Sequence, residues 1–145
     1  MSRSASGCYR SPPCRNYAAP NALKILRQIT ELSSIDRAVH LAIGVFDGIH
    51  RGHQAVIAAA SESARQGGGI PVVVSFDPHP VAVLRPEAAP RLLTSAVHQQ
   101  KILADYGIGH LLVIEFDRAF AAQDANDFIA QLAAACQPLK QICVG

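Results

Sequence analysis

The chain has 145 residues, half of them hydrophobic, and a formal net charge of +2 at pH 7. This length suits one domain, and the apolar content is sufficient for a buried core. No apolar run approaches the roughly 18 residues of a membrane span, so we expect no membrane contact. The small net charge does not indicate nucleic-acid binding, and we expect no nucleic-acid partner.

Residues 1–21 are rich in Ser, Pro, Arg and Cys and show no hydrophobic periodicity. They lack the apolar stretch of a secretory signal, and we predict a disordered N-terminal tail or an extension upstream of the true start codon. A transit peptide is the alternative. Cys8, Cys14, Cys136 and Cys143 form no Cys-x-x-Cys pair, so we expect free thiols in a reducing cytoplasm rather than a disulfide framework.

The first half of the body alternates strands and a helix. Residues 22–39 could form a short strand or a helical turn. Residues 41–46 predict a strand that is buried on both faces, because they are apolar without alternation. A helix is predicted over residues 52–66, with three glycines at 67–69 to end it, and residues 70–76 predict a second buried strand.

The second half continues the same alternation. Four prolines between residues 78 and 90 predict an irregular crossing. A helix follows from about residue 95 to Gly107, with Thr94 as its candidate cap, and residues 111–116 predict a third strand. Residues 125–136 predict an amphipathic helix capped by Asp124, and residues 141–144 a fourth strand. This order predicts an α/β fold with a parallel sheet and right-handed crossovers.

Glycines and two histidines meet where the first strand leads into the first helix. The stretch reads Gly44-Val45-Phe46-Asp47-Gly48-Ile49-His50-Arg51-Gly52-His53. The first N–H groups of a helix lack partners within the helix and carry a partial positive charge, so a helix start binds phosphate. Glycine lets the backbone turn sharply and lets a ligand approach closely. The stretch therefore predicts a site that grips nucleotide phosphate.

A second polar stretch follows the second strand. It reads Ser75-Phe76-Asp77-Pro78-His79-Pro80. In an open parallel sheet, ligands bind beyond the carboxyl ends of the strands, so both stretches should face the same crevice.

These residues also allow plainer interpretations. His50 and His53 could be turn residues that cap the helix. They could also be zinc ligands, but no acidic third ligand is evident, and we expect no metal site built from protein side chains alone. Asp47 could bond its own backbone in a turn, or help to hold Mg²⁺ or water, and Asp77 and His79 leave the same choice open. The phenylalanines at 116, 120 and 128 are expected in the core.

His50-Arg51-Gly52-His53 matches the His-x-Gly-His motif of the nucleotidyltransferase superfamily. Together with Ser75-Phe76-Asp77-Pro78-His79-Pro80, it makes residues 41–145 resemble the FAD synthetase module of bacterial riboflavin-biosynthesis proteins, which often join FMN adenylyltransferase to riboflavin kinase. The resemblance extends to Leu92-Leu93-Thr94, Lys101, Phe116-Asp117-Arg118-Ala119-Phe120-Ala121 and Val144-Gly145.

The resemblance implies a Rossmann-like nucleotidyltransferase fold and the transfer of AMP from ATP to FMN with Mg²⁺, giving FAD and pyrophosphate. It implies that His50 and His53 are catalytic and that Gly52 leaves room for the adenine ring. The ATP site it implies is Gly44, Val45, Phe46, Asp47, Gly48, His50, Gly52 and His53. The flavin and phosphate site it implies is Phe76, Asp77, Pro78, His79 and Pro80. Leu84 stands where some relatives carry an aromatic residue that packs by the flavin.

Relatives continue beyond Val144-Gly145 with another phosphate-gripping segment and a riboflavin kinase domain. We therefore expect residues 22–145 to be a partial domain, incomplete at its C-terminus, with the missing parts on the full gene product and the fourth strand at an exposed sheet edge. Two other functions remain open. One is a non-catalytic nucleotide-binding module of the same fold. The other is an adenylyltransferase for another substrate, such as phosphopantetheine or a nicotinamide nucleotide.

Overall fold

The computed structural model describes residues 22–145, so the predicted tail at residues 1–21, with Cys8 and Cys14, lies outside the described residues. The elements follow in the order β1 (Lys24–Leu26), η1 (Ile29–Ser34, a 3-10 helix), β2 (Val39–Ile43), α1 (Arg51–Gly67), β3 (Ile70–Asp77), α2 (Pro80–Leu84), η2 (Pro86–Ala88, a 3-10 helix), α3 (Ala96–Asp105), β4 (His110–Glu115), α4 (Arg118–Ala121), α5 (Ala125–Ala135) and β5 (Leu139–Val144).

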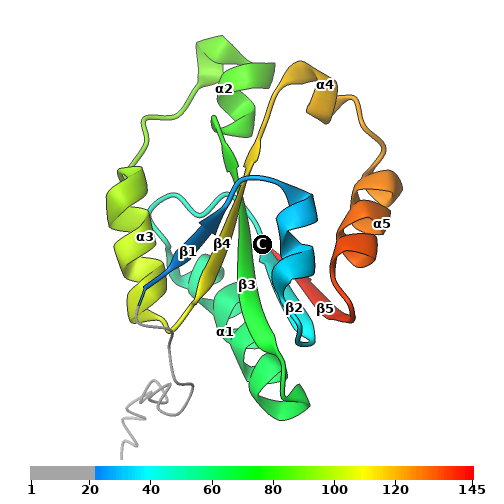
Figure 1. The fold of residues 1–145 in the computed structure, drawn as a ribbon. Helices are drawn as coiled ribbons and strands as arrows, with labels where there is room; N and C mark the ends of the chain where they lie inside the picture. Colours follow the sequence, from blue (N-terminus) through cyan, green and yellow to red (C-terminus); the bar gives the residue numbers. More distant parts are fainter. Residues whose placement is uncertain (1–21) are drawn as a thin grey trace, which may run out of the picture.

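The strands form one five-stranded sheet in the order β1-β4-β3-β2-β5, and every neighbouring pair is parallel. The predicted α/β fold with a parallel sheet is therefore confirmed. β3 and β4 point their carboxyl ends toward α2 and α4 (Figure 1). β5 lies at one edge of the sheet, as expected, and β1 lies at the other.

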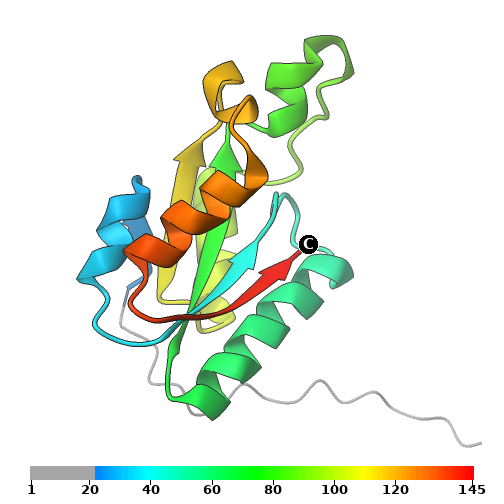
Figure 2. The same ribbon diagram turned by 90° about the vertical axis from the view of Figure 1, so that its right-hand side faces the viewer.

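Helices cover both faces of the sheet (Figure 2). The core on the η1 and α5 face includes Leu41, Val72 and Leu132, whereas the core on the α1 and α3 face includes Ala42 and Val73. Successive strand residues point to opposite faces, so both faces of these central strands are buried. This double burial explains why the strands appear in the sequence as apolar runs without alternation.

The structure corrects two details of the sequence prediction and decides one that was open. The first predicted strand ends at Ile43 rather than residue 46, and the chain then enters a loop. Residues 22–39, where a short strand or a helical turn was possible, form the short strand β1, in which Ile25 pairs with Leu111 of β4, and then the 3-10 helix η1. Thr94 does not cap α3, because Ser95 does so by accepting a hydrogen bond from the His98 N–H. The predicted Asp124 cap of α5 is confirmed, since its carboxylate accepts a hydrogen bond from the Asn126 N–H at 2.8 Å.

Cys136 and Cys143 are free thiols, in agreement with the expectation for this part of the chain. Burial raises the pKa of the Cys136 thiol to about 11, so this thiol stays protonated at neutral pH. Every helix among residues 22–145 is too short or too polar to cross a bilayer.

His40 is a buried imidazole in β2 that should make stability depend on pH. Burial lowers its pKa, the nearby Gln141 side chain acts in the opposite direction, and the charge of Lys140 lowers the pKa further. Because the folded pKa lies below the unfolded value of about 6.5, the unfolded state binds the proton more readily. We expect full stability above that pH and a lower free energy of unfolding as the pH falls below it.

Urea unfolding at a series of pH values would measure this effect. His53 and His110 have pKa values lowered in the same direction, so His40→Gln serves as the matched variant that isolates the contribution of His40. The variant should show a flatter profile than the wild type. Parallel profiles would contradict the assignment to His40.

Candidate active site

The loop after β2 turns the chain from the sheet into α1. Gly48 has a φ of 76° and Ile49 a φ of 37°, so two successive residues adopt left-handed conformations. This conformation is rare for a β-branched residue and persists only where the surroundings hold it. Ile49 is 4% exposed and Phe46 is fully buried, and both belong to the core on the α1 face. Burial of these side chains therefore holds the strained turn.

The turn delivers His50 to the N-cap position of α1, where its imidazole makes no capping hydrogen bond. The rings of His50 and His53 stack with centroids 3.7 Å apart, and the edge of Phe46 packs on His53 at 5.1 Å. A Cβ atom on Gly52 would lie 3.1 Å from Cε1 of His50. The alternative that these histidines cap the helix is therefore not what the structure shows. It shows a stacked pair of imidazoles at the helix start, and any side chain at position 52 would crowd the His50 ring.

The surroundings of His53 lower its pKa, which favours its neutral form. Burial is the largest cause, the nearby His50 lowers the pKa further, and Asp47 partly offsets both effects. Its Nδ1 atom is buried and has no hydrogen-bond partner among residues 22–145. A neutral imidazole donates from one ring nitrogen and accepts at the other.

Asp47 bonds a remote loop rather than its own turn. Its carboxylate accepts hydrogen bonds from the backbone N–H groups of Leu93 and Thr94 at 2.9 Å and from the Thr94 hydroxyl at 3.0 Å. The Gly48 N–H donates to the Thr94 Oγ1 at 3.1 Å. Burial alone would raise the pKa of Asp47, but the bonds from Leu93 and Thr94 and the charge of His79 hold it below its usual value. These hydrogen bonds give a structural role to Leu93 and Thr94 in the Leu92-Leu93-Thr94 stretch, to which the family resemblance extends.

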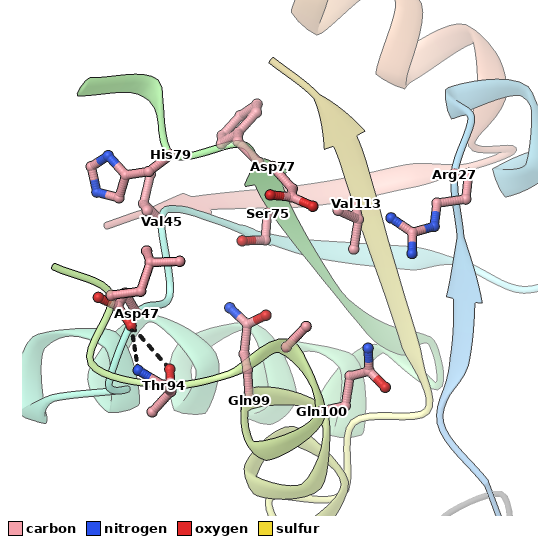
Figure 3. Close-up of a pocket in the computed structure, with 13 residues that line it drawn as sticks. Arg27, Val45, Asp47, Ser75, Asp77, His79, Thr94, Gln99, Gln100 and Val113 are labelled. Carbon is pink, nitrogen blue, oxygen red and sulfur yellow. Dashed lines mark hydrogen bonds between the residues drawn. The ribbon is translucent and has the colours of Figure 1, made fainter. Parts of the chain in front are cut away.

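The loops after β2 and β3 line one pocket, as the topology predicted (Figure 3). Val45 and Asp47 come from the first loop, His79 from the second, and Phe76 and Asp77 from the end of β3. The remaining lining residues come from β3 and β4, the residue after β1, the segment before α3, and α3 itself: Ser75, Val113, Arg27, Leu92, Thr94, Ala96, Gln99 and Gln100. His50 and His53 do not line this pocket, and stand beside it at the start of α1.

The loop after β3 leads directly into α2, and the N-cap of α2 holds its conformation. His79 is the N-cap of α2, and its Nδ1 atom accepts a hydrogen bond from the Val81 N–H at 3.1 Å. Pro80 occupies the first turn, where the missing N–H is tolerated. The other ring nitrogen of His79 remains available to a ligand. Asp77 is exposed, and its carboxylate makes no hydrogen bond or ion pair among residues 22–145.

A second hollow, of about 270 Å³, lies next to this loop and is aromatic. It is lined by Phe76, Leu84, Phe116, Phe120, Ala121, Gln123, Ala125 and Phe128. The rings contact one another mostly edge to face, with centroids 5.9 Å apart for Phe76 and Phe116, and 5.3 Å apart for Phe120 and Phe128. Phe76 lines both this aromatic hollow and the pocket described above.

The expectation that Phe116, Phe120 and Phe128 lie in the core is only partly right. Phe120 and Phe128 pack against the core, but all three rings are half-buried and leave the hollow between them. One signal could have revealed this. These phenylalanines follow the end of a strand at intervals of four and eight residues, beyond the carboxyl edge where ligands bind.

No group of three metal-ligating side chains that could hold an ion occurs in the described part of the chain. Asp47 uses its carboxylate oxygens for the bonds to Leu93 and Thr94. Asp77 is therefore the carboxylate of the pocket that remains available to a cation.

Comparisons with known proteins identify relatives of this chain. Residues 32–145 match the protein family described as FAD synthetase. The bifunctional riboflavin kinase/FMN adenylyltransferase of Escherichia coli K12 is 35% identical over 124 residues, which are 85% of this chain and 40% of that protein. The FAD synthetase of Listeria monocytogenes is 36% identical over 94 residues, which are 64% of this chain and 38% of that protein.

A crystal structure described as a macrolide-efflux protein from Streptococcus pneumoniae superposes with a TM-score of 0.70 and 27% sequence identity, covering 86% of this chain and 41% of that one. The chain thus spans about two fifths of the length of these relatives. The match over residues 32–145 and the level of identity show that the chain belongs to the FAD synthetase family.

Proposed function

We propose that this protein acts in flavin cofactor synthesis by transferring AMP from ATP to FMN, which gives FAD and pyrophosphate. The observation that carries the proposal is Phe76 near the end of β3, which lines both the pocket at the carboxyl end of the sheet and the aromatic hollow. One region suits a nucleotide triphosphate and the other suits a flat heterocycle. Phe76 contributes to both, so a flavin phosphate could reach from the second region toward the first.

On the ATP side, the phosphates would meet the start of α1 and the stacked pair His50 and His53. Residues 44–48 and Gly52 would form the rest of this site. In the reaction, an oxygen of the FMN phosphate attacks the α-phosphorus of ATP, and the bond to pyrophosphate breaks with its electron pair leaving on the pyrophosphate. Positioned donors stabilise the charge that builds on the phosphate oxygens. A neutral His53 would serve as such a donor.

On the flavin side, the isoalloxazine would occupy the aromatic hollow, and the FMN phosphate would lie along residues 76–80. Offset or edge-to-face contacts with the phenylalanine rings favour a planar aromatic ligand. Phosphopantetheine has no aromatic ring at its acceptor end, and a nicotinamide ring is much smaller than the hollow. This lining therefore supports flavin over the two other acceptor substrates.

A magnesium ion fits the residues present if Asp77 holds it together with the ATP phosphates, because Mg²⁺ is commonly bound by one or two carboxylates plus substrate phosphates. The ion would supply charge stabilisation at the phosphates. Asp77 has the free carboxylate for this role, whereas Asp47 does not.

The whole protein would resemble its bifunctional relatives in joining this activity to a riboflavin kinase. We propose a cytoplasmic location and small-molecule substrates, without a nucleic-acid partner.

Binding of FMN to the 145-residue chain tests the proposal directly. Flavin fluorescence should be quenched on titration with the protein, and calorimetry should detect ATP in the presence of Mg²⁺. FAD formation would be followed by chromatography, with the E. coli relative as the positive control. ATP binding without any FMN binding would favour a non-catalytic nucleotide-binding module. Absence of both would contradict the proposal.

Leu84→Phe should tighten FMN binding. Leu84 lines the aromatic hollow and is 54% exposed, so a larger ring at this position has room to cover the flavin. An added aromatic contact contributes about 0.5–1.5 kcal/mol, which corresponds to about a twofold to tenfold gain in affinity. Leu84→Met, which adds no ring, is the control in the same fluorescence titration. Weaker binding by the phenylalanine variant would argue against flavin in this hollow.

A further inference from the structure

The segment between η2 and α3, residues 89–95, is tied to the loop after β2 mainly by hydrogen bonds to Asp47. Of its residues, Thr94 alone is half-buried, and the others are exposed. Among the hydrogen bonds of residues 22–145, those that tie this segment to the loop after β2 end on Asp47 and on the Gly48 N–H. We call this set of contacts between Asp47, Gly48, Leu93 and Thr94 the loop clamp.

The loop clamp acts on the strained turn from the side opposite the core. Asp47 directly precedes Gly48 and Ile49, the two left-handed residues that lead to His50. The buried Ile49 side chain holds the turn from within. Outside, Leu93 packs so closely that a Cβ atom on Gly48 would lie 3.0 Å from its Cδ1 atom. A strained conformation persists only when its surroundings over-determine it, and these two anchors do so.

The loop clamp also shapes the pocket wall. Leu92 and Thr94 line the pocket, and they reach it because the N–H groups of Leu93 and Thr94 are held by the Asp47 carboxylate. In Figure 3 Asp47 and Thr94, joined by hydrogen bonds, lie on the side of the pocket away from Arg27. A third contact supports the same arrangement, because the Gln99 amide of α3 donates to the Phe46 carbonyl at 2.9 Å.

We propose that Asp47 is a positioning residue, whose carboxylate fastens residues 92–94 to the histidine turn and so sets both the stacked histidines and the pocket wall for nucleotide binding. In this proposal Asp47 holds the loop rather than a metal ion, since its carboxylate oxygens already accept hydrogen bonds from three N–H and O–H donors. The inference rests on the proposed function in that the nucleotide is taken to be ATP, whereas the clamp itself can be measured without any ligand.

The experiment compares Asp47→Asn, Thr94→Val, the double variant and the conservative Thr94→Ser in the 145-residue chain. The matched control is Asp124→Asn, because Asp124 also accepts a backbone hydrogen bond but caps α5, away from the histidine turn. ATP affinity is measured by calorimetry with Mg²⁺ and again with EDTA. Hydrogen exchange at the Leu93 and Thr94 amides, measured by NMR without nucleotide, reports on the clamp directly.

We expect Asp47→Asn and Thr94→Val each to weaken ATP binding by at least about fivefold, with and without Mg²⁺. The double variant should be little worse than either single variant, because both remove the same unit, and Thr94→Ser should restore the affinity. Amide protection at Leu93 and Thr94 should fall in Asp47→Asn, while Asp124→Asn should resemble the wild type in every assay.

A loss confined to the Mg²⁺ titration and to Asp47→Asn would show that Asp47 is a metal ligand, and would overturn the inference. Unchanged amide protection in Asp47→Asn would also overturn it. If the wild type binds no ATP, the proposed function fails. The exchange measurement then still decides whether the clamp exists, so the two failures are distinguishable.

Discussion

Replacing His53 with alanine in a full-length version of the protein is expected to lower the rate of FAD formation by at least about tenfold, because the variant loses a positioned donor to the reacting phosphates. The ring of His53 stacks on His50 and contacts the edge of Phe46, so its position is set before the substrate arrives. Such preorganised donors act mainly on the transition state. The expected signature is a larger fall in kcat than in ATP affinity.

The measurement is the steady-state formation of FAD from ATP and FMN, together with ATP affinity by calorimetry. His98→Ala is the matched control, since His98 is exposed on α3 and lines neither pocket. His50→Ala should lower the rate as well, and the double variant should show less than the product of the two effects because the rings contact each other. A wild-type rate for His53→Ala would remove the chemical role that we propose for this histidine.

Replacing Phe116 with alanine is expected to weaken FMN binding by about tenfold, through loss of an aromatic contact and of buried apolar area. Phe116 is the suitable choice within the aromatic hollow. It lines the hollow and contacts Phe76 and Phe120, but it lies outside the group of residues that pack on the main core. A change in flavin affinity can therefore be separated from a general loss of stability.

FMN fluorescence quenching and ATP calorimetry would be run on the same preparation. ATP affinity should be unchanged, because the histidine turn lies outside the aromatic hollow. Phe116→Leu, which keeps an apolar side chain without the ring, should fall between wild type and alanine. Equal losses of FMN and ATP affinity would indicate a folding defect and would contradict a specific flavin contact.

The elements that local pattern determines were predictable. α1 was visible as an amphipathic helix, and Gly68 ends it with a φ of 66°, as the run of three glycines indicated. β2 and β3 were visible as apolar runs because both of their faces are buried. β1 could not be distinguished from a helical turn, since three residues are too few for a pattern and their pairing with β4 is a matter of remote contact.

The same distinction between local features and remote contacts applies to the candidate site. The histidine turn could be located from residue types and spacing alone, since glycine, histidine and a helix start are local features. The partner of Asp47 could not, because its carboxylate was free to bond its own turn, a metal ion or, as the structure shows, a loop 46 residues further along the chain. Thr94 was assigned to a helix cap for the same reason, since the local cap and the remote carboxylate compete for one side chain.

The sequence by itself determined the α/β class, the order of most strands and helices, and the identity of the residues at the ends of β2 and β3. Periodicity and chain order suffice for these, because a buried strand and an amphipathic helix each impose a local pattern. Only the tertiary structure decided that Phe116, Phe120 and Phe128 leave a hollow instead of filling the core, and that Asp47 holds Thr94. Both outcomes depend on the packing of segments that are far apart in the chain, which residue type and spacing do not encode.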